Sequence, residues 1–214
     1  MKLYGYNLSL ASFRVRIAFA LKGIDREDAY LDLLKGDQFE PEFQKLNPQM
    51  VVPALITDEA QVIGQSMAIL EYLDETHPEP PLLPGDAGGR ARVRQLAQIA
   101  IADCHPLVVP RIRKYLTATL GHTEDELLAW IRHWMGLAND AIEAILGDGQ
   151  AGKYAHGSQV TLADLCLIPQ VAGSQRFKCD MSGTPNLMKL FETCMAEDAF
   201  MAAHAKNQPD FQAP

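Results

Sequence analysis

The hydrophobic positions in the first 80 residues switch between the spacing of a strand and that of a helix. Residues 2–6 alternate as a strand does, and the apolar side chains after Ser12 recur at helical spacing until Gly23, which suits a helix C-cap. A second helix is predicted to begin at Ser66. Further strands are predicted at 30–34, 51–56 and 61–63, and a short helix at 41–45. The order β-α-β-α-β-β-α predicts a small α/β domain over residues 1–80.

Beyond residue 80 the strand-like pattern stops. Residues 77–89 contain four prolines and three glycines, and a linker is predicted within them at 81–89. Helical spacing then dominates, with helices predicted at 90–120, 124–146, 162–171 and 187–205. The predicted fold class is therefore α+β, an α/β domain followed by an all-helical domain over 90–214.

One helix start carries a specific signal. Thr161 and Asp164 have the spacing of a capping box, and Val160 and Leu165 are spaced to form the hydrophobic staple around it. We interpret Asp164 as a residue that fixes a core helix, and not as a catalytic acid.

Charge and cysteine content narrow the function. The formal net charge is -8, from 19 basic and 27 acidic residues, which argues against a nucleic-acid or anionic membrane partner. The start of the chain does not resemble a signal peptide, and no apolar run approaches the ~18 residues of a membrane span. The cysteines are spaced too widely for a C-x-x-C metal or redox pair, so we expect reduced thiols, no metal and a cytoplasmic protein. They are Cys104, Cys166, Cys179 and Cys194.

Several short motifs together resemble one family. Ser9-Leu-Ala-Ser12 lies between the first strand and the first helix, Val52-Pro53 precedes a strand, and Gln65-Ser66 opens a helix about a dozen residues later. This arrangement resembles the cytosolic glutathione transferases. Other segments are similar to the zeta class, which includes maleylacetoacetate and maleylpyruvate isomerases. They are Arg14-Val-Arg16, Asn47-Pro48-Gln49, His105-Pro106-Leu107, the run from Asp164 to Gln170, and Arg176-Phe-Lys178.

The resemblance implies a thioredoxin-like first domain that binds glutathione, which would lie between the two domains of a homodimer. Ser9 would donate its hydroxyl hydrogen to the glutathione thiolate, while Ser12 is either an alternative thiol contact or only the N-cap of its helix. Pro53 would be cis and would present the backbone of Val52 to the cysteinyl amide. A proline at an edge strand is the other interpretation.

Four further residues are implied as glutathione contacts. Gln65 and Ser66 would receive the γ-glutamyl carboxylate at a helix N-terminus, although Ser66 is also an ordinary N-cap candidate. Gln38 would reach the glycine end. His105 would lie near the tripeptide or would simply pack beside a proline.

The same resemblance implies an arginine for the second substrate. Arg176 would hold a substrate carboxylate, with a surface salt bridge as the alternative role, and Arg111 and Arg14 are further candidates. The implied reaction is cis–trans isomerisation of a maleyl-type diketo acid in aromatic degradation, with Ser9 and Arg176 as catalytic residues and glutathione as cofactor.

The chain departs from the zeta pattern where the second substrate would bind. These departures make that half of the site more apolar, and they lie at Leu8, Leu10, Ala11, Val108, Val109 and Pro110. Two alternatives therefore stay open: a transferase or dehalogenase acting on apolar electrophiles, and a glutathione transferase-like binding module without turnover.

Overall fold

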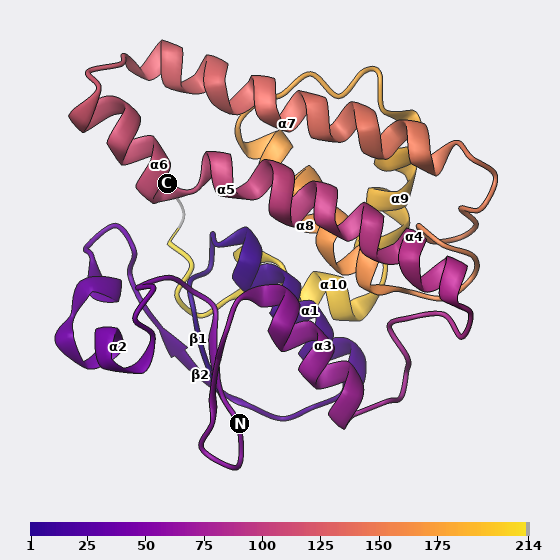
Figure 1. The fold of residues 1–214 in the computed structure, drawn as a ribbon, viewed down its shortest axis with the longest axis horizontal. Helices are drawn as coiled ribbons and strands as arrows, with labels where there is room; N and C mark the ends of the chain where they lie inside the picture. The colour runs from indigo at the N-terminus through magenta and orange to yellow at the C-terminus, as the bar shows by residue number, and fades with distance from the viewer. Residues whose placement is uncertain (213–214) are drawn as a thin grey trace. The chain divides into compact units, whose positions relative to one another are not determined.

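The computed structural model describes residues 1–212, and its contacts divide the chain into two compact units. The first contains Met1–Leu82 together with the segment from Met195 onward, and the second is Leu83–Cys194 (Figure 1). A small mixed sheet lies in the first unit, and the second is helical, so the predicted α+β architecture is confirmed.

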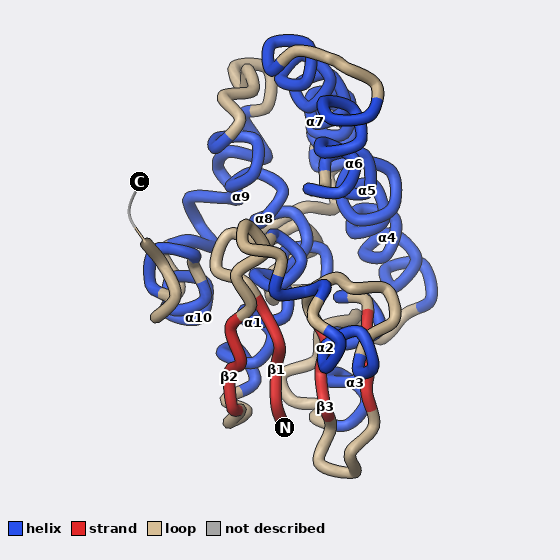
Figure 2. Tube along the Cα trace, turned by 90° about the vertical axis from the view of Figure 1, so that its left-hand side faces the viewer, coloured by secondary structure: helices blue, strands red, loops and turns tan. Residues whose placement is uncertain are grey.

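The first unit is built on a four-stranded sheet in the order β2-β1-β3-β4 (Figure 2). Strand β1 (Lys2–Gly5) pairs in parallel with β2 (Glu27–Tyr30) and antiparallel with β3 (Ala54–Ile56), which pairs antiparallel with β4 (Val62–Gly64). The parallel pair requires a crossover, and α1 (Leu10–Lys22) supplies it. Helix α3 (Ser66–Thr76) follows β4 directly and packs against α1.

Alternation along the strands gives the sheet two buried faces. Tyr4 and Ala54 lie with Phe43 of α2 (Pro41–Leu46), next to the short 3₁₀ helix Asp37–Phe39. Leu3 and Leu55 are also buried, and they point to the opposite face because neighbouring strand residues alternate. The sheet is thus covered on both sides, which holds the loops at its end in fixed positions.

The second strand differs from the prediction. The prediction is a strand at 30–34, whereas the observed strand lies at Glu27–Tyr30, a polar strand at the edge of the sheet beside β1. The apolar residues that suggested the later position, Leu31 and Leu33, instead pack in a loop against the Phe43 cluster. The packing of these loop residues produces the same alternation of apolar positions as a strand does.

The second unit consists of a run of helices. Asp86 caps α4 (Ala87–Gln98) by accepting from the Gly89 backbone at 2.8 Å, so the helix begins inside the predicted 81–89 linker. The predicted helix 90–120 is broken into shorter elements around Pro106 and Pro110. They are α4, a π-helical stretch Ile99–Cys104, α5 (His105–Val108), α6 (Pro110–Lys114) and a second π-helical stretch Tyr115–Thr119.

Three further helices of this unit are α7 (Glu124–Leu146), α8 (Leu162–Arg176) and α9 (Pro185–Met195). Helix α8 is buried almost all round, as expected of a central core helix. Its start confirms the predicted capping box: Asp164 accepts from the Thr161 backbone at 2.7 Å and from its hydroxyl at 2.8 Å.

The last segment belongs to the first unit, and not to the helical domain in which we had placed it. The predicted helix 187–205 is divided, because α9 ends at Met195 and α10 (Asp198–Ala203) packs on α1. Arg16 of α1 donates to the Ala203 carbonyl at 2.9 Å, and the Asn7 backbone donates to Asp210 at 2.9 Å. A 3₁₀ turn, Ala205–Asn207, follows α10.

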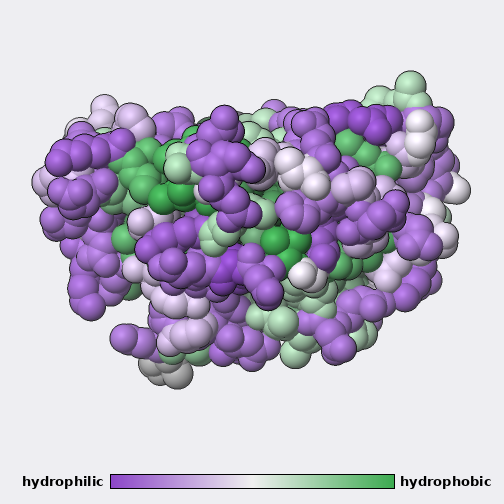
Figure 3. Space-filling view, turned by 90° about the horizontal axis from the view of Figure 1, so that it is seen from below, coloured by the Kyte–Doolittle hydropathy of each residue, from purple (hydrophilic) through white to green (hydrophobic). Residues whose placement is uncertain are grey.

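The face drawn in Figure 3 is largely hydrophilic, with hydrophobic residues in separate patches. Within residues 1–212, every helix is too short or too polar to cross a lipid bilayer. The same residues include no cluster of histidine, cysteine and acidic side chains that could hold a metal ion.

Candidate active site

Ser9 is the N-cap of α1, so the alternative that Ser12 caps this helix is wrong. Ser9 has extended backbone angles, and its Oγ accepts from the Ser12 backbone N–H at 3.2 Å. Ser12 is inside the helix and fully buried, with its own Oγ accepting from Tyr6 N at 3.4 Å. A hydroxyl that accepts a hydrogen bond can still donate its hydrogen. Half-buried Ser9 therefore keeps a donor at the positive end of α1.

The loop before β3 contains the expected cis proline. The Val52-Pro53 peptide bond is cis, and both residues are buried. Within the described part of the chain, no hydrogen bond engages the Val52 main chain. Its N–H and C=O are therefore free to pair with an extended peptide, as strand-addition ligands do.

Gln65 and Ser66 form the start of α3, and the backbone there is unusual. Gln65 has φ 65° and ψ 120°, a left-handed conformation that strains a residue other than glycine. Ser66 is the first helical residue and is only 6% exposed. The N–H groups of a first helical turn have no partner within the helix, so this end of α3 is suited to an anion.

Asn47 and Gln49, which lie in one turn, bind the loop before β3 and the start of α3. The sequence analysis did not assign them this role. The Asn47 amide donates to the Val51 carbonyl at 2.8 Å and accepts from Gln49 N at 3.1 Å. Gln49 in turn accepts from the Gln65 side chain at 2.8 Å. The sequence does contain a signal for this turn, because Asn47 followed by Pro48 favours a turn that the Asn side chain stabilises.

Arg14 does not occupy the position predicted for a substrate contact. It is 1% exposed, and its Nη1 donates to Ser66 Oγ at 3.2 Å. A buried guanidinium cannot receive a carboxylate that arrives from solvent, so the structure assigns Arg14 to the base of α3.

Gln38 lies in the 3₁₀ helix beside α2 and is 9% exposed. Its Oε1 is buried, and no residue of the described chain donates to it. Buried polar atoms are normally satisfied, so this acceptor fits a peptide ligand that brings a donor.

The remaining predicted residues lie in the helical unit. His105 begins α5 and is half-buried, while Arg111 is exposed on α6. Arg176 is the last residue of α8 and is exposed, with its guanidinium carbon 5.0 Å from the centre of the Phe177 ring. The C-terminal end of a helix favours a cation, which helps to place Arg176.

Comparison with known proteins places the chain in a family. The model for the glutathione S-transferase N-terminal domain matches residues 3–81, and that for the C-terminal domain matches residues 137–198. The chain belongs to the glutathione S-transferase family. Its N-terminal domain carries the Val52-Pro53 and Gln65-Ser66 features described above.

Individual relatives extend the similarity over the whole chain. A maleylpyruvate isomerase of Ralstonia sp is 44% identical over 211 residues, which cover 98% of this chain and 99% of that protein. A solved holo maleylpyruvate isomerase, described as a bacterial zeta-class enzyme, is 44% identical with a TM-score of 0.95, over 98% of this chain and 99% of that one. A maleylacetoacetate isomerase from Methylobacterium extorquens AM1, solved with malonate and glutathione bound, is 40% identical with a TM-score of 0.97, over all of both chains. The resemblance to the zeta class is therefore confirmed.

Half of the six departures from the zeta pattern turn out to be packing residues of this glutathione S-transferase. Leu10 and Ala11 are buried in α1, and Val108 is buried in the core of the helical unit. Val109 and Pro110 form the junction between α5 and α6. At Leu10, Ala11 and Val108, the apolar character contributes to the protein core.

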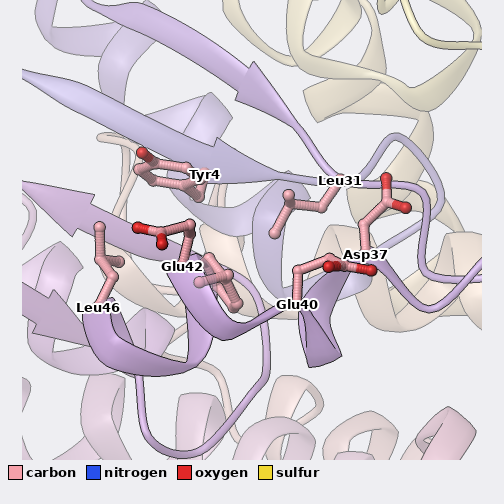
Figure 4. A pocket seen from close by; sticks show the side chains of 7 residues that line it. Tyr4, Leu31, Asp37, Glu40, Glu42 and Leu46 are labelled. Atoms are coloured by element: carbon pink, nitrogen blue, oxygen red, sulfur yellow. The ribbon is translucent and has the colours of Figure 1, made fainter.

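The first unit also contains a hollow that the sequence analysis missed. Its volume is about 440 Å³, and Figure 4 shows carboxylates of Asp37, Glu40 and Glu42 around it. Apolar residues from the sheet and α2 form the rest of its lining, namely Tyr4, Leu31, Phe43 and Leu46. An anionic tripeptide is repelled by this rim, and none of the predicted glutathione contacts lines it.

Proposed function

We propose that this protein is a glutathione-dependent cis–trans isomerase of a maleyl-type diketo acid, maleylpyruvate or maleylacetoacetate. The observation that carries the proposal is the 44% identity, over nearly the full length of both chains, to a maleylpyruvate isomerase. A dicarboxylate, malonate, and glutathione are bound together in the structure of a second relative, which supports an acidic substrate.

The first unit offers a matching group for each part of glutathione. The N-terminus of α3 at Gln65 and Ser66 would hold the γ-glutamyl carboxylate, and the unpaired main chain of Val52 would pair with the cysteinyl amide. The unsatisfied Oε1 of Gln38 would accept from the glycine end. Donors would meet the γ-glutamyl carboxylate and acceptors would meet N–H groups of the peptide, so the residues present fit the tripeptide.

When bound, glutathione would supply a thiolate nucleophile that each turnover regenerates. Ser9 would stabilise the ionised sulfur by donating its hydroxyl hydrogen, because its oxygen already accepts from Ser12 N. The N-terminus of α1 adds a partial positive charge of about half a unit at the same place.

Arg176 would hold a carboxylate of the diketo acid. A guanidinium presents parallel N–H groups that match the two carboxylate oxygens, and Arg176 is exposed. Arg111, exposed on α6, is a second cation of the same unit. Binding of its carboxylate in this way would restrict the orientation of the diketo acid.

We further propose that the protein is a cytoplasmic homodimer. The proposal of a cytoplasmic location is supported by the cysteines, because no disulfide joins Cys104, Cys166, Cys179 and Cys194 in the described part of the chain. The proposal of a homodimer rests on analogy with the family.

Calorimetric titration with glutathione tests the proposed cofactor site. The wild type should bind, and Ser66→Ala should bind roughly ten- to a hundredfold more weakly, since a hydrogen bond to a charged group is lost. Ser158→Ala is the matched control, because Ser158 is exposed in the helical unit. A wild type that does not bind glutathione would rule out the proposed function.

A further inference from the structure

We propose that Arg14 is a positioning residue for the carboxylate-binding end of the glutathione site, acting through Ser66. The inference rests on the proposed function, which places the γ-glutamyl carboxylate at the start of α3. Arg14 has two effects: it fixes the direction of the Ser66 hydroxyl, and it adds positive charge behind the helix N-terminus.

Burial is the first observation. Arg14 is among the largest fully buried side chains of the protein, in a stretch of α1 that is buried on all sides from Leu10 to Phe19. Burying a guanidinium is costly compared with burying an apolar side chain of similar size. An arginine at this position therefore needs a reason that packing alone does not provide.

The hydrogen bond to Ser66 gives the first part of that reason. A guanidinium has only donors, so in the 3.2 Å contact the Ser66 oxygen must accept. The Ser66 hydrogen is then directed away from Arg14. A hydroxyl that accepts from a cation is also a stronger donor, because linked hydrogen bonds polarise each other. Ser66 is thereby held ready to donate to an anion.

Electrostatics give the second part. The N-terminus of α3, an 11-residue helix, carries a partial positive charge, and the Arg14 guanidinium has the same sign. A carboxylate bound beside Ser66 would be attracted by both of these positive features.

A neighbouring arginine shows what a structural role looks like in the same helix. Arg16 is also buried, but it donates to three main-chain carbonyls, those of Tyr6, Asn7 and Ala203, at 3.2, 3.0 and 2.9 Å. These bonds tie the loop before α1 and the end of α10 to the helix. Arg16 is therefore a matched control for Arg14.

Two peptides separate the carboxylate effect from general damage. Glutathione and its analogue 4-aminobutyryl-Cys-Gly differ only in the γ-glutamyl α-carboxylate. Calorimetric titration of the full chain with each peptide should show that Arg14→Gln raises the Kd for glutathione about tenfold, since it removes a charge near the bound anion. The Kd for the analogue should change less than about twofold, because the analogue has no carboxylate for the charge to act on. Arg14→Lys keeps the charge and should stay within about threefold of the wild type for both peptides.

The control variants separate an effect of Arg14 on carboxylate binding from a loss of stability. Arg16→Gln should lower the Tm but leave the ratio of the two Kd values unchanged. Equal weakening of both peptides by Arg14→Gln, or no weakening of either, would overturn the role of Arg14 while leaving the glutathione site intact. If Arg14→Gln does not fold, Arg14→Lys decides, because loss of the preference for glutathione in a variant that keeps the charge contradicts the inference. A wild type that binds neither peptide removes the proposed function itself.

Discussion

At the scale of single residues, the two serines at the start of α1 show how much the sequence could tell. Ser9 and Ser12 were both candidates for the thiol contact, since each is a hydroxyl between a strand and a helix. Sequence spacing could not separate them, because a helix boundary is uncertain by one or two residues. The structure buries Ser12 inside the helix and leaves Ser9 at its N-terminus.

We expect Ser9→Ala to lower kcat about ten- to a hundredfold, because a donor to the charged sulfur is worth roughly 1.5–3 kcal/mol. Glutathione affinity should change little. The substitution also removes an N-cap, so Ser9→Gly is the matched control: glycine is tolerated at this position but lacks the hydroxyl. The fall in kcat should be the same in both variants, whereas their Tm values should differ. Full activity in either variant would show that Ser9 is only a cap.

The role of Arg176 can be tested by substitution, with Lys178, a cation two residues away, as the control. Arg176→Ala should raise the KM for maleylpyruvate by about one to two powers of ten, through loss of a charge-assisted pair. Lys178→Ala changes the net charge equally at another exposed residue and should leave this KM unchanged. Neither substitution should change the rate at which a neutral electrophile is conjugated. An equal effect of Arg176→Ala on acidic and neutral substrates would make Arg176 structural.

At the scale of elements, the start of α8 is the best-specified feature. Asp164 accepts from Ala155 N at 2.8 Å as well as from Thr161, and Arg92 donates to the Ala155 carbonyl at 2.7 Å. Both the N–H and the C=O of Ala155 are thus hydrogen-bonded. Burial raises the pKa of Asp164 to about 6, so the carboxylate is still ionised at neutral pH and accepts three hydrogen bonds.

Replacing Asp164 by asparagine should lower the free energy of unfolding by about 2–4 kcal/mol at neutral pH, because an amide N–H₂ would face backbone donors. The effect should depend on pH. The raised pKa means that the folded state binds more protons than the unfolded state between about pH 4 and 6, so the stability contribution of Asp164 falls as pH rises through this window. The difference between wild type and variant should therefore narrow from pH 4 to pH 6.5.

Urea unfolding followed by circular dichroism at several pH values measures this difference. Glu126→Gln is the matched control, because Glu126 occupies the same position in the exposed capping box of α7 and glutamine still caps. It should change stability little. A difference that widens with rising pH would contradict the assignment for Asp164.

Other elements were predicted less well, for physical reasons. Helices α3, α7 and α8 have clear periodicity or caps, and they were predicted close to their observed starts. Strand β2 was displaced, because its own residues are polar at the sheet edge while the following loop is apolar. The strain at Gln65 and the bond from Arg14 to Ser66 arise from tertiary contacts, which no local pattern contains.

At the scale of the whole molecule, composition located the change from α/β to helical structure. It did not show that the C-terminal segment packs in the first unit. Proline and glycine mark the linker, whereas nothing in the sequence near Met195 signals that the following residues pack on α1. Such long-range contacts depend on three-dimensional complementarity. The domain boundary at the C-terminal end was therefore placed wrongly.

Sedimentation velocity tests the proposed homodimer. At micromolar concentration the protein should sediment with about twice the 23.6 kDa mass of the chain. A single monomeric species across the concentration range would refute the dimer. It would leave the proposed glutathione contacts, which all belong to one chain, unaffected.

The stoichiometry of glutathione tests the central claim most directly. Purified protein is incubated with maleylpyruvate and a small amount of glutathione, and the cis and trans isomers are followed by NMR while free thiol is titrated. We predict that the trans isomer accumulates far beyond the amount of glutathione present, with free thiol unchanged at the end. Loss of one thiol for each substrate molecule consumed would identify a conjugating transferase, and the absence of any turnover would identify a binding module; either result would contradict the isomerase.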